Sequence, residues 1–427
     1  MLKFHNSMAK RILLTTTGSL GDLHPYIAIG LELRARGHAV TLATSNFYQS
    51  KVEQTGLKFA PMGPHLGLET LKVMDRVMDA KNGPEYLIRH LLYPAVPAAY
   101  AEVMEAVRDA DLIVTHPITF AAQIAAEKTG MPWVSTVTAP LSFFSRFDPS
   151  VMAPYPWVIK LRALGPAFFG FIKTLGRVMT KFWLAPITRF RASVGLPPGQ
   201  DPIFEGQHSP QRVLAMFSPL MEAPQPDWPA QTVVTGFPFY DQAEHGQGID
   251  PELERFLDAG PPPVVFTLGS SAVQAAGRFY HESIAAVQHL ACRAVLLVGG
   301  NSFQEPPPAG IVAFPYAPFS KIFPRAAVIV HQGGIGTCAQ ALAAGRPMLV
   351  VPFAFDQPDN AARLQRLGVA RAIPRKHYTG QRAYSELQPL LTDAAYAVSA
   401  VEVAHKIAQE NGVRAASDAI ENHPPAH

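Results

Sequence analysis

Short apolar segments alternate with helical segments in two separate series along this chain of 427 residues. In the first series the expected strands are 11–17, 39–43, 111–115 and 133–137, with helices at 25–36 and 120–129. In the second series they are 264–268, 294–298, 328–330 and 348–351, again with helices between them. Strands that are joined through helices pair in parallel and are covered by helices on both faces. The pattern therefore predicts an α/β fold with two Rossmann-like domains, each a doubly wound parallel sheet.

A stretch rich in proline and glycine separates the two series and sets the expected domain boundaries. We expect a first domain over 1–236, a linker over 237–263 with a short helix at 251–258, and a second domain over 264–400. The remaining 401–427 is expected to form a C-terminal helix and tail that pack back on the first domain. Open parallel sheets bind ligands at the carboxyl ends of their strands, so two such domains predict a binding cleft between them.

The composition excludes several classes of protein. A formal net charge of +3, without clustered basic runs and interleaved aromatic residues, argues against nucleic-acid binding. The two cysteines, Cys292 and Cys338, are too few for a disulfide framework or a thiolate metal site. The first residues lack the charged start, apolar stretch and cleavage site of a secretory signal. We therefore expect a cytoplasmic protein.

The segment 156–191 is the part of the chain that suggests contact with a membrane. It carries seven basic residues and no acidic residue. Its apolar run at 163–172 is ten residues long, whereas a membrane-spanning helix needs about 20. A basic, aromatic, amphipathic stretch can instead rest on an anionic bilayer, and the expected surface is the inner membrane face. The alternative is a helix that walls an apolar pocket, and both can hold together.

The most specific motif is His-Gln-Gly-Gly-Ile-Gly-Thr at 331–337, directly after an expected strand and before an expected helix. Its glycines allow a ligand to approach the backbone closely, and the helix start presents unpaired N–H groups and a partial positive charge. The motif lacks a Walker lysine, so it indicates a turn that binds a diphosphate and argues against an enzyme that transfers phosphoryl groups. The alternative is a tight turn with no ligand. The residues expected to hold the diphosphate are His331, Gly333, Gly334, Gly336 and Thr337.

Two further polar groups follow strands of the second series. Asp356 and Gln357 come shortly after its last strand, and an adjacent carboxylate and amide suit a polyol because they accept from and donate to neighbouring hydroxyls. Taken alone, the pair also fits an ordinary loop. Ser270 and Ser271 follow the first strand of this series and can offer hydroxyls to the same diphosphate.

An aromatic run at 314–319 precedes the glycine motif. Tyr316 can stack on a nucleotide base, with backbone groups near Ala317 reading the edge of that base. The same aromatic residues also fit ordinary core packing. No Asp-x-Asp metal motif occurs, and the nearest arrangement is Asp356-Gln-Pro-Asp359. We therefore expect no essential metal.

The first expected strand ends in a turn with the sequence Gly-Ser-Leu-Gly-Asp-Leu-His-Pro at 18–25. We expect Pro25 at the start of the following helix, where its missing N–H costs nothing. Asp22 then points across the mouth of the cleft, with His24 two residues further on. A carboxylate in this position can act as general base on an acceptor hydroxyl. The alternative is that Asp22 only caps the helix.

Together these residues resemble the family 1 glycosyltransferases of the GT-B fold, over nearly the whole chain. The motif at 331–337, followed by Asp356 and Gln357, is similar to that family's nucleotide-sugar signature. The turn at 18–25 is similar to bacterial members, which include macrolide, glycopeptide and sterol glycosyltransferases. Among these, bacterial rhamnolipid rhamnosyltransferases, which use dTDP-rhamnose and a lipid acceptor, look most similar at 208–211, 225–228, 235–238 and 355–360.

The resemblance implies a role for each motif residue. Asp22 takes the base position that plant members fill with histidine. His116 follows a middle strand, where plant members carry an orienting aspartate; with Asp22 as base this partner is not needed, so His116 is expected to line the pocket. Gln340 replaces a ribose-binding glutamate, and Tyr316 replaces a base-stacking tryptophan, which leaves uridine and thymidine both open. The resemblance further implies that the diphosphate is held by His331, Ser270 and Thr337, with Gly21 nearby, and the sugar by Asp356 and Gln357.

We therefore expect an inverting transfer of a hexose or 6-deoxyhexose from a UDP- or dTDP-sugar to a hydroxyl of a lipid, sterol, polyketide or flavonoid, without a cofactor. Aromatic residues crowd the first half of the chain beyond the need of a core. The acceptor pocket is expected to contain His116, Phe143, Phe144 and Phe168. Two other functional classes stay open: a nucleotide-sugar epimerase of the same fold, and a non-catalytic lipid- or nucleotide-binding subunit. The oligomeric state also stays open.

Overall fold

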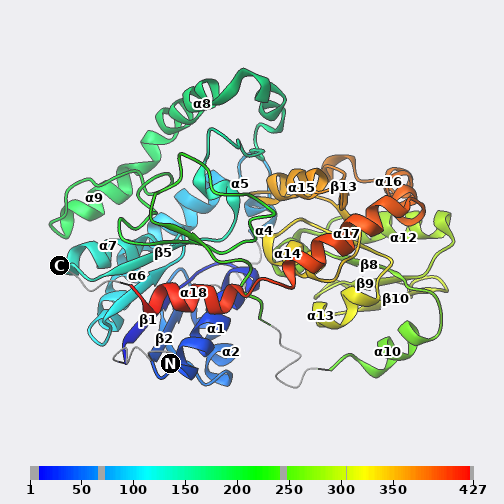
Figure 1. The fold of residues 1–427 in the computed structure, drawn as a ribbon, viewed down its shortest axis with the longest axis horizontal. Helices are drawn as coiled ribbons and strands as arrows, with labels where there is room; N and C mark the ends of the chain where they lie inside the picture. Colours follow the sequence, from blue (N-terminus) through cyan, green and yellow to red (C-terminus); the bar gives the residue numbers. More distant parts are fainter. Residues whose placement is uncertain (1–8, 66–72, 241–247, 304, 424–427) are drawn as a thin grey trace, which may run out of the picture.

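The computed structural model describes residues 9–65, 73–240, 248–303 and 305–423, which form two α/β domains side by side (Figure 1). In the first domain, seven parallel strands have the order β3-β2-β1-β4-β5-β6-β7. These strands are β1 (Arg11–Thr15), β2 (Ala39–Thr44), β3 (Lys58–Pro61), β4 (Leu112–Thr115), β5 (Trp133–Val137), β6 (Val213–Ala215) and β7 (Thr232–Val234).

In the second domain, six parallel strands have the order β10-β9-β8-β11-β12-β13. These strands are β8 (Val264–Thr267), β9 (Ala294–Leu297), β10 (Ile311–Phe314), β11 (Val328–His331), β12 (Met348–Val350) and β13 (Ala370–Ala372). Counted from the start of each domain, both orders begin 3-2-1-4-5-6, the order of the doubly wound nucleotide-binding fold. The prediction of two Rossmann-like domains is confirmed.

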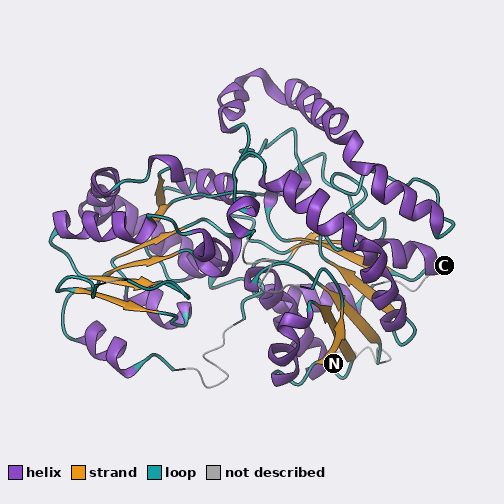
Figure 2. Cartoon of the chain, turned by 180° about the vertical axis from the view of Figure 1, so that it is seen from behind, coloured by secondary structure: helices purple, strands orange, loops and turns teal. Residues whose placement is uncertain are grey.

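Helices cover both faces of each sheet (Figure 2). Those of the first domain are α1 (Leu20–Ala35), α2 (Gln49–Gln54), α4 (Met74–Val77), α5 (Gly83–Tyr86), α6 (Tyr93–Val107), α7 (Phe120–Thr129), α8 (Gly165–Thr180) and α9 (Ala185–Ser193). Those that follow are α10 (Pro251–Asp258), α11 (Gly269–Ala272), α12 (Phe279–Leu290), α13 (Phe319–Ile322), α14 (Ile335–Ala343), α15 (Gln357–Arg366), α16 (Gly380–Thr392), α17 (Ala394–Ile407) and α18 (Gly412–Glu421).

Burial explains which strands the sequence predicts. The strands β4, β8 and β11 are buried along their whole length, and such strands form continuous apolar runs. The strands β3, β6, β7, β10 and β13 were not expected. Each has three or four residues and lies at or next to a sheet edge. The edge strands β3, β7, β10 and β13 are also only partly buried, so they lack a continuous apolar run. Of the predicted linker, 241–247 lies outside the described residues, and the helix expected at 251–258 is α10.

The first helix begins earlier than expected, at Leu20 rather than at Pro25. Its N-cap is Ser19, whose hydroxyl accepts a hydrogen bond from the N–H of Gly21 at 3.2 Å. In return, Asp22 accepts from the N–H of Ser19 at 2.8 Å, which completes a capping box. Pro25 therefore lies inside the helix, and the prediction that it opens the helix is wrong.

The last helix, α18, returns to the first domain and packs on α1 (Figure 1, red). Arg36, at the end of α1, forms ion pairs with Asp418 and Glu421 at 2.5 and 3.1 Å. Ala416 and Ile420 are fully buried in the same apolar cluster as Leu33 of α1. The end of the described chain therefore ties the second domain to the first.

The helices α8 and α9 form an arm along the outer side of the first domain (Figure 1). We call residues 156–191 the α8 arm; it also contains the short helices η4 (Pro156–Leu164) and η5 (Lys181–Leu184). No helix within the described ranges is long and apolar enough to cross a bilayer. The large apolar side chains of the arm that are between 53% and 65% exposed are Trp157, Leu164, Phe171, Val178, Met179 and Phe182.

Candidate active site

A cavity of about 1500 Å³ lies between the two domains, at the carboxyl ends of both sheets. Its walls include the turns that follow β1, β4 and β8 and those that follow β11 and β12. This is the place where open parallel sheets bind ligands. The volume exceeds the range of about 300–1000 Å³ that is usual for ligand pockets, so the cavity has room for two substrates.

Most residues that the sequence singles out line this cavity. Those from the first domain are Gly21, Asp22, His24, His116 and Phe144. Those from the second domain are Ser270, Ser271, Tyr316, Gly334, Gly336, Thr337, Gln340, Asp356 and Gln357. The fold therefore brings the two predicted groups of residues to one cavity from opposite domains.

Five expected residues do not line the cavity, and three of them, Phe143, Phe168 and Ala317, lie outside the glycine turn. Phe143 is 4% exposed and stacks on Trp228, with ring centroids 3.9 Å apart, so it belongs to a core cluster. On α8, Phe169 lines the cavity and Phe168 does not, because neighbouring residues on a helix point in different directions. The side chain of Ala317 is 2% exposed and packs in the core. The expectation that Phe143 and Phe168 line the acceptor pocket is therefore wrong.

The glycine turn after β11 needs its glycines. Gly333 has a φ of +87°, and a Cβ there would lie 2.8 Å from Cγ1 of Val350 and 3.1 Å from the carbonyl oxygen of Gln357. In the turn after β8, Gly269 has a φ of +63°, and a Cβ there would lie 2.4 Å from Nε2 of Gln332. Side chains rarely adopt this backbone and do not fit this space, so the two turns pack closely beside the cavity.

His331 lies behind the turn rather than on the cavity wall, and Gly333 is not on the wall either. The His331 side chain is fully buried, and its Nδ1 accepts a hydrogen bond from the N–H of Gly333 at 3.1 Å. Burial lowers the pKa of His331 to about 3, so the ring is neutral and carries its proton on Nε2. This Nε2 has no hydrogen-bond partner among the described residues. The observed role of His331 is to hold the turn, and its contact with a phosphate stays a prediction.

Sequence reasoning missed Gln332, which lines the cavity next to Thr337. The Gln332 side chain is 4% exposed, and its Nε2 lies 3.4 Å from the hydroxyl oxygen of Thr337. Its Oε1 is buried without a hydrogen-bond partner among the described residues. The position of Gln332 inside the glycine motif could have indicated a role in binding. Which side chain of a turn enters the cavity, however, depends on the backbone conformation of the turn.

Asp356 and Gln357 lie at the start of α15. The Oε1 of Gln357 accepts hydrogen bonds from two backbone N–H groups of the preceding loop, at 2.8 and 3.2 Å, which leaves its NH₂ group for a ligand. Asn360 donates from Nδ2 to Oδ2 of Asp356 at 2.7 Å. Burial raises the pKa of Asp356 to about 7, and the charge of Asp22 adds to the increase.

Asp22 both caps α1 and lines the cavity, and its role as general base stays a prediction. Its Oδ2 accepts hydrogen bonds from the N–H and the hydroxyl of Ser19, at 2.8 and 3.1 Å. Its Oδ1 lies 3.3 Å from Nε2 of His116, an electrostatic contact rather than a well-aligned hydrogen bond, and the side chain is 32% exposed. Nδ1 of His116 accepts from the N–H of Ile118 at 3.3 Å, so Nε2, which faces Asp22, carries a proton.

The surroundings of Asp22 lower its pKa. Burial alone would raise this pKa, but the His116 ring and the two hydrogen bonds from Ser19 outweigh burial. Asp22 is therefore ionised at neutral pH. His116 lines the cavity as expected, and it also lies against Asp22, a contact that the sequence did not indicate.

His24 is uncharged in this environment. Burial lowers its pKa to about 4, and the charge of Lys51 contributes. Its ring lies 5.1 Å from the ring of Tyr240, measured between centroids. A neutral imidazole can accept a proton, but a pKa of about 4 makes it a much weaker base than an ordinary histidine, whose pKa is about 6.5.

The α8 arm gives the first-domain side of the cavity an apolar wall. Phe169, Ile172, Met179 and Trp183 line the cavity from this arm. Such a wall suits an apolar ligand. Within the described residues, no group of three or more His, Cys, Asp or Glu side chains is arranged to hold a metal ion.

Comparison with known protein families agrees with this geometry. The sequence model of the glycosyltransferase family 28 N-terminal domain matches residues 12–142. The model described as "Erythromycin biosynthesis protein CIII-like, C-terminal domain" matches residues 281–417. The two matches fall on the two domains, and each includes turns that line the cavity.

Individual relatives cover almost the whole chain. The chain is 35% identical to O-mycaminosyltylonolide 6-deoxyallosyltransferase of Streptomyces fradiae, over 96% of this chain and 97% of the relative. It is 26% identical to a sterol 3-beta-glucosyltransferase of Arabidopsis thaliana, over 97% of this chain and 66% of the relative. The solved structure of the glycosyltransferase VinC in complex with dTDP has a TM-score of 0.67 at 19% identity, over 97% and 100% of the two chains. The chain therefore belongs to the family 1 glycosyltransferases of the GT-B fold, which use nucleotide-sugar donors.

Proposed function

We propose that this enzyme transfers a hexose or 6-deoxyhexose from a UDP- or dTDP-sugar to a hydroxyl of a hydrophobic acceptor, with inversion at the anomeric carbon. The observation that carries the proposal is the position of Asp22, an ionised carboxylate in the cavity between an apolar wall and the glycine turn of the other domain. In this proposal 1–236 binds the acceptor and 264–400 binds the donor.

The second domain offers suitable groups for each part of the donor. The start of α14 has no side-chain cap, so its N–H groups and partial positive charge are free for a diphosphate, beside the hydroxyls of Ser270, Ser271 and Thr337. Tyr316 and Gln340 line the same cavity for the base and the ribose. The dTDP complex of VinC, which has the same fold, supports a pyrimidine nucleotide here.

The first domain offers an apolar acceptor pocket. The wall formed by the α8 arm and Phe144 suits a ligand with a large apolar surface. The relative from Arabidopsis thaliana is named for a sterol acceptor, which supports the same class. The proposed acceptor is therefore a lipid, sterol, polyketide or flavonoid with a free hydroxyl.

In the proposed step, the acceptor hydroxyl attacks the anomeric carbon from the face opposite the diphosphate. The hydroxyl proton passes to Asp22, the bond from the anomeric carbon to the diphosphate oxygen breaks, and the nucleoside diphosphate leaves with the electron pair. Because its pKa is low, Asp22 is a weak base and must take the proton as the new bond forms. The N–H groups at the start of α14 stabilise the charge on the leaving diphosphate.

The variant Asp22→Asn tests this proposal. Asn keeps the size of the side chain, so donor binding is expected to be unchanged, while turnover falls by about 10²–10⁴-fold. The assay measures nucleoside diphosphate release with a panel of UDP- and dTDP-sugars and hydrophobic acceptors. The control is Asp111→Asn, which removes an exposed ion pair with Arg11 in the same domain. Near-wild-type turnover in Asp22→Asn would move the base role to His24 or His116.

We also propose that the α8 arm rests on an anionic lipid surface, at the inner membrane face. Lys160, Lys181 and Arg189 are exposed beside its apolar side chains and have no ion-pair partner within the described ranges. The other basic residues of the arm pair with carboxylates. Because α8 also lines the cavity, a hydrophobic acceptor can pass from the lipid into the pocket.

Sedimentation with lipid vesicles tests this contact. Binding is expected to vesicles that contain phosphatidylglycerol, to weaken in salt, and to be lost in Phe171→Ser/Val178→Ser. The matched control is Val398→Ser/Val401→Ser, which removes two exposed valines from α17. If the arm variant binds vesicles like wild type, or changes the oligomeric state instead, the arm is not a lipid contact.

A further inference from the structure

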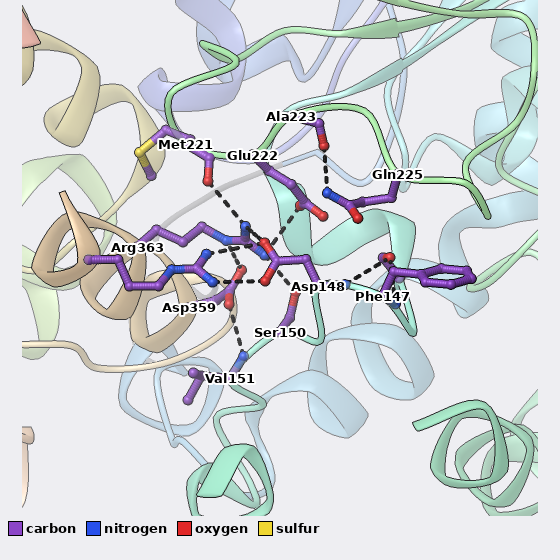
Figure 3. A network of polar contacts seen from close by, with 12 residues as sticks. Phe147, Asp148, Ser150, Val151, Met221, Glu222, Ala223, Gln225, Asp359 and Arg363 are labelled. Carbon is purple, nitrogen blue, oxygen red and sulfur yellow. Dashed lines mark hydrogen bonds and ion pairs between the residues drawn. The ribbon is translucent and has the colours of Figure 1, made fainter. Parts of the chain in front are cut away.

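A buried arginine of the second domain joins loops of the first domain (Figure 3). Arg363 of α15 is 1% exposed, and its Nε donates to Oδ2 of Asp359 on the same helix at 2.7 Å. Its Nη1 donates to Oδ2 of Asp148 at 2.8 Å and to the carbonyl oxygen of Met221 at 3.1 Å. Its Nη2 donates to the hydroxyl of Ser150 at 3.3 Å. Every guanidinium nitrogen has a partner, and most partners belong to the first domain.

Two further side chains complete the cluster. Glu222 of the first domain is buried, and its Oε2 lies 3.2 Å from Nη2 of Arg363. Arg366, at the end of the same helix, forms an ion pair with Asp148 at 2.8 Å. Burying an arginine is unfavourable unless such partners surround it. The cluster is therefore complete only while the two domains are in contact.

The same helix begins with the pair that is proposed to hold the donor sugar. Asp356 is the N-cap of α15, and Gln357 is its first residue. Asn360, one turn further, donates from Nδ2 to Oδ2 of Asp356 at 2.7 Å and to the carbonyl oxygen of Gly333 at 2.9 Å. One side of α15 is therefore attached to the glycine turn, and Asp359 and Arg363 attach it to the first domain.

The first-domain end of the cluster lines the same cavity as the acceptor wall. Ser150, which binds Arg363, lines the cavity, and so do Pro149 and Met152. The N–H of Val151 donates to Oδ1 of Asp359 at 2.9 Å. Arg363 itself does not line the cavity. It connects the wall of the acceptor pocket to the helix that carries the sugar-binding pair.

We propose that Arg363 is a positioning residue, which fixes Asp356 and Gln357 relative to the acceptor wall of the first domain. The inference rests on the proposed sugar-binding role of this pair. Arg363 touches no substrate, and its effect is to hold the sugar at the distance from the acceptor at which transfer takes place. A displacement of about 1 Å at the reacting atoms can cost about 10²-fold in rate.

Two variants test the proposal, each with two ligands. Arg363→Gln removes the positive charge, and Asp148→Asn keeps the arginine but removes the charge of its first-domain partner. The ligands are a nucleoside diphosphate, UDP or dTDP, and the corresponding sugar nucleotide that the wild-type enzyme turns over. Both variants are expected to lose affinity for the sugar nucleotide and about 10²-fold in kcat/KM, while their affinity for the nucleoside diphosphate is unchanged.

The control is Arg371→Gln, which breaks an ion pair with Glu386 inside the second domain and is expected to behave like wild type. If Arg363→Gln does not fold, Asp148→Asn decides alone. Equal losses for both ligands, or no loss in a folded Asp148→Asn protein, overturn the positioning role. If the wild-type protein itself binds the sugar nucleotide no more tightly than the nucleoside diphosphate, the sugar-binding role of Asp356 and Gln357 fails first, and the positioning role fails with it.

Discussion

A Cβ on Gly336 would lie only 3.8 Å from the Cα of Gly21, so glycines from the two domains face each other at the cavity. Gly21 is the second residue of α1, and Gly336 is the second residue of α14. Two helix starts therefore meet from opposite sides. The start of α1 is occupied by its own capping box, formed by Ser19 and Asp22, whereas the start of α14 has no side-chain cap. An anion between the domains therefore belongs on α14.

This close approach predicts that Gly336→Val weakens donor binding. The branched side chain would separate the two helix starts and cover the N–H groups that are proposed to bind the diphosphate. Gly336→Ala is the matched control, because a Cβ at 3.8 Å is an ordinary van der Waals contact. Calorimetric titration with UDP and dTDP is expected to show a large loss of affinity for Gly336→Val and a small one for Gly336→Ala. Equal affinities would place the diphosphate elsewhere.

The contact between His116 and Asp22 predicts an effect of His116→Ala on pH dependence. The His116 ring helps to lower the pKa of Asp22, so its removal is expected to raise that pKa. A base is active when it has lost its proton, so the acid-side fall in kcat is expected to begin at a higher pH than in wild type. The pH profile of kcat with saturating donor measures this shift. If His116→Ala changes neither the pH at which kcat falls on the acid side nor kcat itself, His116 only lines the pocket.

The raised pKa of Asp356 predicts that affinity for the donor sugar depends on pH. This carboxyl group has a pKa of about 7, and an ionised carboxylate accepts stronger hydrogen bonds from sugar hydroxyls than a neutral acid does. Affinity for the sugar nucleotide, relative to the nucleoside diphosphate alone, is therefore expected to increase from pH 6 to pH 8. Asp356→Asn is expected to remove this increase. The same pH dependence in the variant would assign the titration to another group.

Glu222 predicts a pH dependence of stability. Burial raises its pKa from 4.5 to about 8, so between these values the folded protein holds a proton that the unfolded chain has released. Stability therefore falls as pH rises through this window. In Glu222→Gln this contribution is absent, so the variant is expected to gain stability relative to wild type from pH 5 to pH 8. Thermal unfolding midpoints at the two pH values measure the difference, and parallel midpoints would contradict the assignment.

The sequence predicted the central strands of both sheets better than the edges. A strand such as β8 is buried on both faces, so its residues form an apolar run that can be recognised locally. The edge strand β13 has three residues and is only partly buried, so nothing local distinguishes it from a loop. The start of α1 was misplaced for a different reason, because Pro25 and the capping box of Ser19 and Asp22 are competing signals for a helix start.

Some features of the candidate site could likewise be predicted from the sequence, and others could not. Glycine-rich turns after strands identified Asp22 and the turn at 331–337, and an adjacent carboxylate and amide after a strand identified the pair at 356–357. Parallel sheets bring such strand ends together at one edge. The sequence could not show that Gln332 enters the cavity while His331 lies behind it. It also could not show that His116 contacts Asp22.

The amino-acid sequence by itself determined the two parallel sheets, the cleft between them and the chemical groups at its edges, because apolar runs and glycine turns act within a few residues. Only the tertiary structure decided the environment of Arg363. In the sequence this arginine looks like an exposed residue of a polar helix, and Asp148 lies 215 residues away from it. Burial and charge pairing depend on packing between domains, so they exist only once the distant segments have met.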